Sequence, residues 1–126
     1  MCGIAGFVGF SHLGDEGPDA VAMRMATAIA HRGPDDAGTW LDPERQVALA
    51  HRRLSIVDLS AAGHQPMVSA RGRFVVTYNG EIYNHAELRS QLDNGRVWRG
   101  HSDTETLLAA FEAWGVEATL KRAPTP

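Results

Sequence analysis

The chain has 126 residues, of which 44% are hydrophobic and 21% are charged, with a formal net charge of −3. This composition fits one globular domain, and the interspersed charges provide no basic surface for nucleic acid or a membrane. The single cysteine excludes an intrachain disulfide, and no run of about 18 apolar residues could cross a bilayer. We therefore expect a cytoplasmic protein with no nucleic-acid or membrane partner.

Apolar spacing and turn residues divide the first half of the chain into a strand, a helix and two further strands. Residues 3–10 are expected to form a buried strand, and residues 18–31 a helix with proline in its first turn. Turn chemistry predicts a loop at residues 32–36. Two strands are then expected, around residues 38–41 and 46–56, with Asp42-Pro43 as the turn between them.

The second half begins with a loop at residues 59–66 and a strong strand prediction at residues 73–78. Capping-box patterns at Asn84 and Ser102 each predict the start of a helix. The first helix should end at Asn94-Gly95. The second should bury Leu107, Leu108, Phe111 and Trp114 and use Gly115 as its C-cap. Helices and strands alternate without a strict βαβ rhythm, which predicts a mixed α and β class.

Cys2 has the most informative chemistry in the chain. Methionine before a small second residue is normally trimmed, and its removal would leave Cys2 with a free α-amine. Reference pKa values are about 7.7–8.0 for such an amine and about 8.5 for a thiol. One residue would then supply both the nucleophile and the general base. Because a cysteine at the second position usually has no function, the neighbouring motifs must decide.

Six segments, in this order, resemble the type-2 glutamine amidotransferase domain of asparagine synthetases and related amidotransferases. They are Met1-Cys2-Gly3-Ile4-Ala5-Gly6, His31-Arg32-Gly33-Pro34-Asp35, His51-Arg52-Arg53-Leu54-Ser55-Ile56-Val57-Asp58, Gln65-Pro66-Met67, Tyr78-Asn79-Gly80-Glu81-Ile82-Tyr83-Asn84 and Ser102-Asp103-Thr104-Glu105. The resemblance implies an α+β fold, the four-layer αββα sandwich of N-terminal-nucleophile hydrolases. It also implies that this sandwich is incomplete at the C-terminal end, because the strands expected after residue 122 are absent. Residues 1–122 would then be a partial amidotransferase domain, and residues 123–126 a frayed tail.

The same resemblance implies a catalytic mechanism. The Cys2 thiolate would attack the side-chain amide of glutamine, giving a thioester and ammonia, and water would then release glutamate. Asn79, through its side-chain amide, and Gly80, through its backbone N–H, are implied as the oxyanion hole. Without the other motifs, the type I′ turn of a β-hairpin would be the favoured interpretation of Asn79-Gly80.

Five further residues are implied to bind glutamine. Arg53 would bind the α-carboxylate as a planar fork, Asp103 would hold the α-ammonium, and Glu81 would add a contact at the same end. The backbone around Ile56 and Val57 would line the site. Two alternatives stay open: Arg53 could be a solvated surface arginine, and Asp103 could serve only the dipole of its helix.

We expect no cofactor in this fragment, because the sequence has neither a dinucleotide or P-loop glycine motif nor histidines at metal-ligand spacing. The resemblance assigns ATP and Mg to a missing synthetase domain or subunit, with glutamine as the small-molecule substrate. Three hypotheses remain: the glutaminase part of an asparagine-synthetase-like enzyme, an inactive remnant or partner-binding fragment, and an N-terminal-nucleophile hydrolase acting on another amide.

Overall fold

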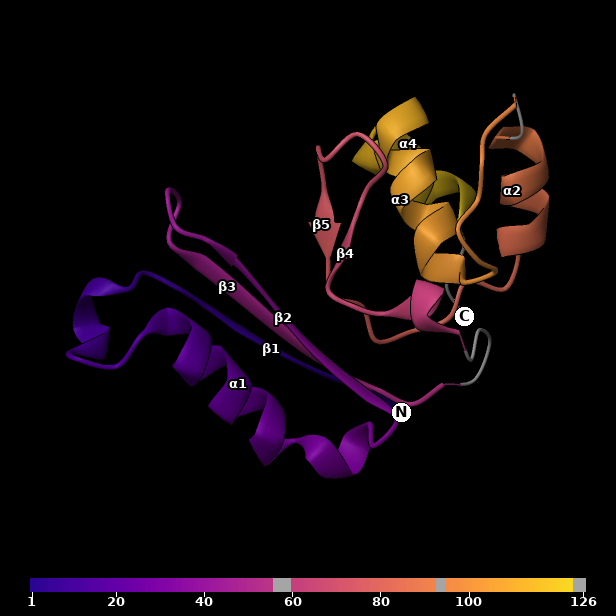
Figure 1. The fold of residues 1–126 in the computed structure, drawn as a ribbon. Helices are drawn as coiled ribbons and strands as arrows, with labels where there is room; N and C mark the ends of the chain where they lie inside the picture. Colours follow the sequence, from indigo (N-terminus) through magenta and orange to yellow (C-terminus); the bar gives the residue numbers. More distant parts are fainter. Residues whose placement is uncertain (56–59, 93–94, 124–126) are drawn as a thin grey trace. The chain divides into compact units, whose positions relative to one another are not determined.

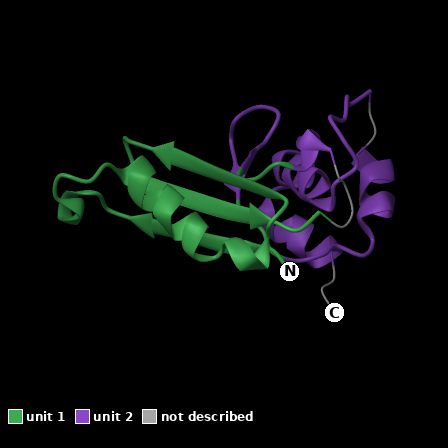
Figure 2. Cartoon of the chain, turned by 60° about the horizontal axis from the view of Figure 1, so that its bottom comes forward, with its two compact units in different colours: residues 1–55, 64–66, 77–79 green, residues 56–63, 67–76, 80–126 purple. Residues whose placement is uncertain are grey.

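The computed structural model describes residues 1–55, 60–92 and 95–123, and the chain divides into two compact units. Unit 1 contains residues 1–55, 64–66 and 77–79, and unit 2 contains the remaining described residues (Figure 2). The short segments 64–66 and 77–79 therefore pack with the N-terminal part of the chain, although the residues on either side of each segment belong to unit 2.

Unit 1 is a three-stranded antiparallel sheet with a helix along one face (Figure 1). Its elements are β1 (Gly3–Val8), α1 (Pro18–Ala28), β2 (Asp36–Asp42) and β3 (Val47–Arg53), with 3-10 turns η1 (Ser11–Leu13) and η2 (Ala30–Arg32). The strand order is β1-β3-β2, so β3 is hydrogen-bonded on both sides. Gly3 pairs with Arg52, and Asp36 pairs with Arg53. These registers bring the beginnings of β1 and β2 to the end of β3.

Small residues allow α1 to lie close to the sheet. Ala22 and Ala26 of the helix are buried, as are Ala48 and Ala50 of β3. A Cβ atom on Gly3 would stand 2.8 Å from the side chain of Ile29. The core of this unit is therefore a thin layer in which close packing of small side chains replaces large apolar groups.

Unit 2 is built around one long helix. Its elements are η3 (Ala61–Gly63), β4 (Met67–Val68), β5 (Val75–Val76), α2 (His85–Leu92), α3 (Asp103–Trp114) and α4 (Val116–Arg122). Helix α3 packs against α2, α4 and β4, and its first eight residues are all buried. Leu92, Ala109 and Ala110 form a core cluster, and Trp98 and Trp114 pack on it.

Most of the expected elements in unit 1 are confirmed, with shifted ends. The first strand ends at Val8 and is not buried throughout as expected, because Ile4 and Val8 are 50% and 74% exposed. The helix expected to reach residue 31 ends at Ala28 and is followed by the 3-10 turn η2. The strand expected to reach residue 56 ends at Arg53, and Ile56 lies outside the described residues. The whole is a mixed α and β fold with small antiparallel sheets, as expected. The four-layer sandwich stays a prediction.

Two predictions in the second half of the chain need correction. The strand expected at residues 73–78 is reduced to Val75–Val76, because the backbone N–H of Tyr78 binds a side chain and joins no β-ladder. The capping box at Asn84 does not form. The amide of Asn84 donates to the Arg122 carbonyl oxygen at 2.8 Å, and its Oδ1 has no partner among the described residues.

The second capping box forms in part. The Ser102 hydroxyl accepts a hydrogen bond from the Glu105 N–H at 3.2 Å. The Glu105 carboxylate turns instead to the backbone N–H groups of Arg99 and Gly100, at 2.8 and 2.9 Å. Gly115 ends α3 with a φ of 86°, as expected for a C-cap glycine. No helix in the described part of the chain is long and apolar enough to cross a bilayer.

Candidate active site

Cys2 lies directly before β1, where both its backbone and its side chain are held. Its Sγ accepts a hydrogen bond from the Leu54 N–H at 3.3 Å, and its thiol lies 3.6 Å from the Leu54 carbonyl oxygen. Its own carbonyl oxygen accepts from Nε of Arg32 at 3.2 Å. Met1 precedes it and is 73% exposed. The half-buried sulfur is thus fixed at the end of β3, while the residue before it is accessible.

Arg53 is the last residue of β3 and belongs to the same unit as Cys2. Only 7% of it is exposed, so the alternative of a solvated surface arginine is wrong. Its backbone carbonyl accepts from the Asp35 N–H at 3.0 Å, which fixes this end of the strand. Because Gly3 pairs with Arg52, Cys2 and Arg53 occupy the next positions along the neighbouring strands.

The segment 77–79, which ends in Asn79, is held against β3 and residues 64–66 within unit 1. The Thr77 hydroxyl donates to the Ala50 carbonyl oxygen at 3.3 Å. Nε2 of His51 lies 3.1 Å from the Tyr78 carbonyl oxygen, and the Tyr78 N–H donates to Oε1 of Gln65 at 2.7 Å. Burial is the main cause that lowers the pKa of His51, so its ring is neutral at pH 7 and donates through Nε2.

The functional interest of His51 and Gln65 was not predicted from the sequence. Both residues are in the motifs quoted above, but no role was attached to either. Their place in those motifs is the one signal in the sequence, because the burial that makes each of them need a polar partner is a property of the folded chain.

Gly80, Glu81 and Asp103 belong to unit 2. Asp103 is the first residue of α3, and its Oδ2 accepts a hydrogen bond from the Ile82 N–H at 2.9 Å. This bond holds the start of α3 beside the segment that begins with Gly80-Glu81. Asp103 is only 7% exposed, so its carboxylate does more than face the dipole of its helix.

Asn79-Gly80 lies between β5 and α2, so the alternative of a β-hairpin turn is wrong. The structure therefore brings Cys2, Arg53 and Asn79 into one unit and Gly80, Glu81 and Asp103 into the other. Ile56 and Val57 lie outside the described residues. The roles of all these residues stay predictions.

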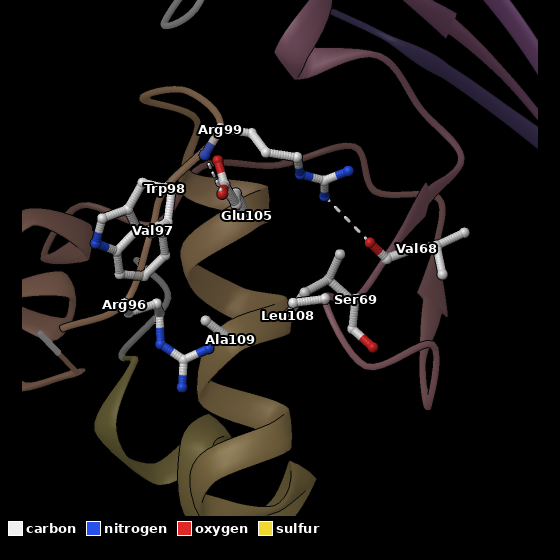
Figure 3. A pocket seen from close by; sticks show the side chains of 10 residues that line it. Val68, Ser69, Arg96, Val97, Trp98, Arg99, Glu105, Leu108 and Ala109 are labelled. Atoms are coloured by element: carbon white, nitrogen blue, oxygen red, sulfur yellow. Dashed lines mark hydrogen bonds between the residues drawn. The ribbon is translucent and has the colours of Figure 1, made fainter. Parts of the chain in front are cut away.

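A hollow of about 340 Å³ lies inside unit 2, between β4 and α3 (Figure 3). Arg99 crosses its rim, and its guanidinium donates to the Val68 carbonyl oxygen at 3.1 Å. The residues that line it include none of the predicted site residues; they are Val68, Ser69, Ala70, Arg96, Val97, Trp98, Arg99, Glu105, Leu108 and Ala109. Among the residues that the structure describes, no group of three or more His, Cys, Asp or Glu could hold a metal ion.

Comparisons with known proteins agree with this arrangement of motifs. A family model described as "Glutamine amidotransferase domain" matches residues 1–124. The chain is 39% identical over 130 residues to a "Putative asparagine synthetase [glutamine-hydrolyzing]" of Mycobacterium tuberculosis, covering 93% of this chain and 20% of that protein. It is 38% identical over 117 residues to "Asparagine synthetase [glutamine-hydrolyzing] 1" of Arabidopsis thaliana, covering 93% and 19%.

A third relative has a different name. "Amidase chry2" of Gibberella zeae is 37% identical over 124 residues, covering 92% of this chain and 18% of that protein. The chain thus spans about a fifth of the length of the curated relatives that it matches. Since the family model covers nearly all of its residues, the chain belongs to the glutamine amidotransferase domain family.

Proposed function

We propose that the chain hydrolyses glutamine to glutamate and ammonia, as the glutaminase part of an asparagine-synthetase-like amidotransferase. The observation that carries the proposal is that the Cys2 sulfur and the segment ending in Asn79 lie in one unit, the sulfur bonded to Leu54 directly after β3 and the segment to His51 within β3. An enzyme that forms a thioester needs a nucleophile and an oxyanion donor on a rigid support, and a central strand provides such a support.

In the proposed mechanism, removal of Met1 frees the α-amine of Cys2, which takes the thiol proton. The thiolate adds to the side-chain carbonyl carbon of glutamine, and the carbon–nitrogen bond then breaks. Ammonia leaves with the proton returned by the α-ammonium group. Water next attacks the thioester carbonyl, which releases glutamate and restores the thiol. The exposed position of Met1 supports the first step, because a trimming enzyme could reach it.

The side-chain amide of Asn79 and the N–H of Gly80 are the proposed donors to the oxygen that becomes negative during both attacks. Such donors act on charge that develops only in the transition state, and loss of one typically costs about 3–4 kcal/mol. Support comes from the two hydrogen bonds that hold Tyr78, the residue before Asn79.

We further propose that Arg53 binds the α-carboxylate of glutamine and Asp103 its α-ammonium, with Glu81 and the backbone of Ile56 and Val57 as additional contacts. A planar guanidinium suits a carboxylate, and both proposed charged residues are buried rather than solvated. This pairing with a free amino acid favours glutamine over amides that lack a zwitterionic end.

The ammonia would be used by an ATP-dependent synthetase domain or subunit, which would also hold ATP and Mg. This part of the proposal is supported by the relatives, which bear the name asparagine synthetase and are about five times as long. Within the same proposal, residues 1–122 belong to the four-layer αββα amidotransferase domain and residues 123–126 form its tail. Residues 124–126 lie outside the described residues.

The test measures glutamate and ammonia released from glutamine by purified chain whose N-terminus has been read by mass spectrometry. Chain that begins at Cys2 should be active, and Cys2→Ala should lower turnover by at least about a thousandfold, as expected for loss of a nucleophile. The matched control is the same polypeptide with Met1 still attached, which blocks the amine and should be inactive. Folded, trimmed chain without activity would contradict the proposal and favour a non-catalytic remnant. Equal activity with Met1 attached would contradict the role of the amine.

A further inference from the structure

We propose that His51 and Gln65 are positioning residues for glutamine hydrolysis: they hold the two backbone polar groups of Tyr78 and thereby fix the direction of Asn79. This inference rests on the proposed function and adds to it two residues that do not touch glutamine. Their hydrogen bonds to Tyr78 are 3.1 and 2.7 Å long. All four residues belong to unit 1.

Gln65 is fixed to the sheet before it reaches Tyr78. A Cβ on Gly38 of β2 would stand only 2.1 Å from the Gln65 carbonyl oxygen, so the backbone at residue 65 lies directly on β2. The neighbouring His64 bonds through Nδ1 to the Asp36 carboxylate, also on β2. The Gln65 side chain is 8% exposed, and its Oε1 accepts from the Tyr78 N–H. The N–H of Tyr78 is therefore tied to β2 through Gln65.

His51 ties the other side of Tyr78 to β3. Only 1% of His51 is exposed, and β3 is the central strand, bonded to β1 and β2. A carbonyl oxygen can only accept a hydrogen bond, so Nε2 of the neutral ring carries the proton that is shared with Tyr78. The carbonyl oxygen of Tyr78 thus requires Nε2 of His51 to be the donor. The position of that donor is fixed by β3, which could shift only if its hydrogen bonds to β1 and β2 were broken.

The carbonyl of Tyr78 belongs to the peptide group that also contains the nitrogen and Cα of Asn79. Because a peptide group is planar, the bond from His51 fixes the direction in which the chain enters Asn79. The bond from Gln65 fixes the peptide group on the other side of Tyr78. Two bonds therefore restrain both dihedral angles of Tyr78, although residues 77–79 lie outside any strand or helix.

This restraint matters because an oxyanion donor is effective only when it is oriented before the reaction begins. A displacement of about 1 Å far from the reacting bond can cost about a hundredfold in rate. Loosening Tyr78 should therefore slow the chemical step while leaving the binding of glutamine nearly unchanged. A residue that only stabilised the fold would not produce this separation.

The experiment uses the trimmed chain and two pairs of variants. Gln65→Leu removes the acceptor and Gln65→Glu keeps an acceptor oxygen; His51→Leu removes the donor and His51→Gln keeps a side-chain N–H. Each Leu variant should lower kcat for glutamine about 10- to 100-fold, with KM within about twofold of the original value. Each conservative variant should recover kcat to within about fivefold. His12→Leu and Gln91→Leu make the same substitutions at exposed positions and should leave kcat unchanged.

A second measurement uses a reaction of Cys2 that forms no oxyanion. Iodoacetamide alkylates the Cys2 thiolate at a saturated carbon, displacing iodide without forming a negatively charged carbonyl oxygen. Its rate should stay within about twofold in all variants, because the nucleophile itself is unaffected. Alkylation that slows in parallel with turnover would overturn the proposal, as would a rise in KM with kcat unchanged or a failure of both conservative variants to recover activity.

An inactive original chain would contradict the proposed function. The hydrogen bond from the Tyr78 N–H to Gln65 can be tested separately from activity. The amide hydrogen of Tyr78 should exchange at least about tenfold faster in Gln65→Leu, because its acceptor is gone. The same amide should exchange at the original rate in Gln91→Leu. Unchanged exchange in Gln65→Leu would overturn the hold on Tyr78, whatever the activity of the chain.

Discussion

The surroundings of Tyr78 in unit 1 and the first turn of α3 in unit 2 both hold backbone groups through buried polar side chains, but these side chains are of different kinds. In unit 1, two neutral groups, His51 and Gln65, bind the backbone of one residue. In unit 2, two carboxylates bind backbone N–H groups: Asp103 that of Ile82, and Glu105 those of Arg99 and Gly100.

The difference follows from the local backbone. A helix N-terminus has unpaired N–H groups and a partial positive charge, so carboxylates are stabilised there even when they are buried. The centre of an antiparallel sheet has no such field, because its strand dipoles cancel. A charged group at the position of His51 would be costly, and the neutral ring avoids this cost. A negative charge should therefore stabilise the start of α3, and the neutral form of the ring should be the stabilising one at the position of His51 in β3.

The largest expected effect is at Glu105. Glu105→Ala removes the acceptor of two short hydrogen bonds, of 2.8 and 2.9 Å, and a buried charge at a helix N-terminus. Because a hydrogen bond to an ionised group typically stabilises by about 1.5–3 kcal/mol, the free energy of unfolding should fall by about 3 kcal/mol. Urea unfolding measures the loss. Hydrogen exchange should become faster mainly at the backbone amides of unit 2.

Glu105→Gln is the matched control for this variant. It keeps the size of the side chain and one oxygen acceptor, but it turns an NH₂ group toward the second N–H donor. Its loss should be smaller than that of Glu105→Ala and larger than zero. A loss below about 1 kcal/mol in Glu105→Ala would show that the start of α3 does not depend on charge.

The second-largest expected effect is at Gly38, where β2 supports the segment that contains Gln65. In Gly38→Ala the new methyl group would stand 2.1 Å from the Gln65 carbonyl oxygen and 2.6 Å from Nε2 of His64. Overpacking of this kind typically costs about 1–3 kcal/mol, and we expect about 2 kcal/mol in the free energy of unfolding. Amide exchange should place the loss in unit 1.

Gly17→Ala is the control for this variant. Its new methyl group would meet only the carboxylate of Asp19, which is the end of an exposed side chain and can rotate away. A loss of less than about 1 kcal/mol is expected there. Equal losses in the two variants would mean that Gln65 is not held by close packing on β2.

The sequence predicted elements whose signals are local and missed features that depend on distant partners. Apolar spacing identified β1, α1 and α3, because each packs against other elements of its own unit. The strand expected at residues 73–78 stops at Val76, since Tyr78 bonds to Gln65, 13 residues away. The side-chain amide of Asn84 donates to the Arg122 carbonyl oxygen, 38 residues away, and its Oδ1 accepts no N–H of the helix.

The candidate site shows the same limit. Cys2, Asn79 and Arg53 could be singled out because their chemistry is visible in short motifs. The contact between His51 and Tyr78 joins residues 27 apart, so neither the burial of the ring nor its partner can be read from local spacing. A position that holds another residue in place has no chemical signature of its own, and only the packed structure reveals it.

The smallest expected effect is the pH dependence that His51 gives to unit 1. Burial is the main cause that lowers its pKa below 6.5, and the positive charges of His64 and Arg53 act in the same direction; the bond to Tyr78 and the Asp36 carboxylate act against them. The unfolded chain therefore binds a proton at a higher pH than the folded chain. The contribution of neutral His51 to stability is complete above about pH 6.5 and is lost as the pH falls toward the lowered pKa.

Replacing the ring with an amide removes this titration. In His51→Gln, the free energy of unfolding should decline less between pH 7 and pH 5 than in the original chain, by at most about 1.4 kcal/mol per pH unit for one proton. Urea unfolding at pH 7, 6 and 5 measures the two slopes, and His12→Gln, at an exposed position, should keep the original slope. Parallel curves for His51→Gln and the original chain would mean that the buried ring accepts a proton without cost. The position of His51 would then tolerate charge as well as the start of α3 does.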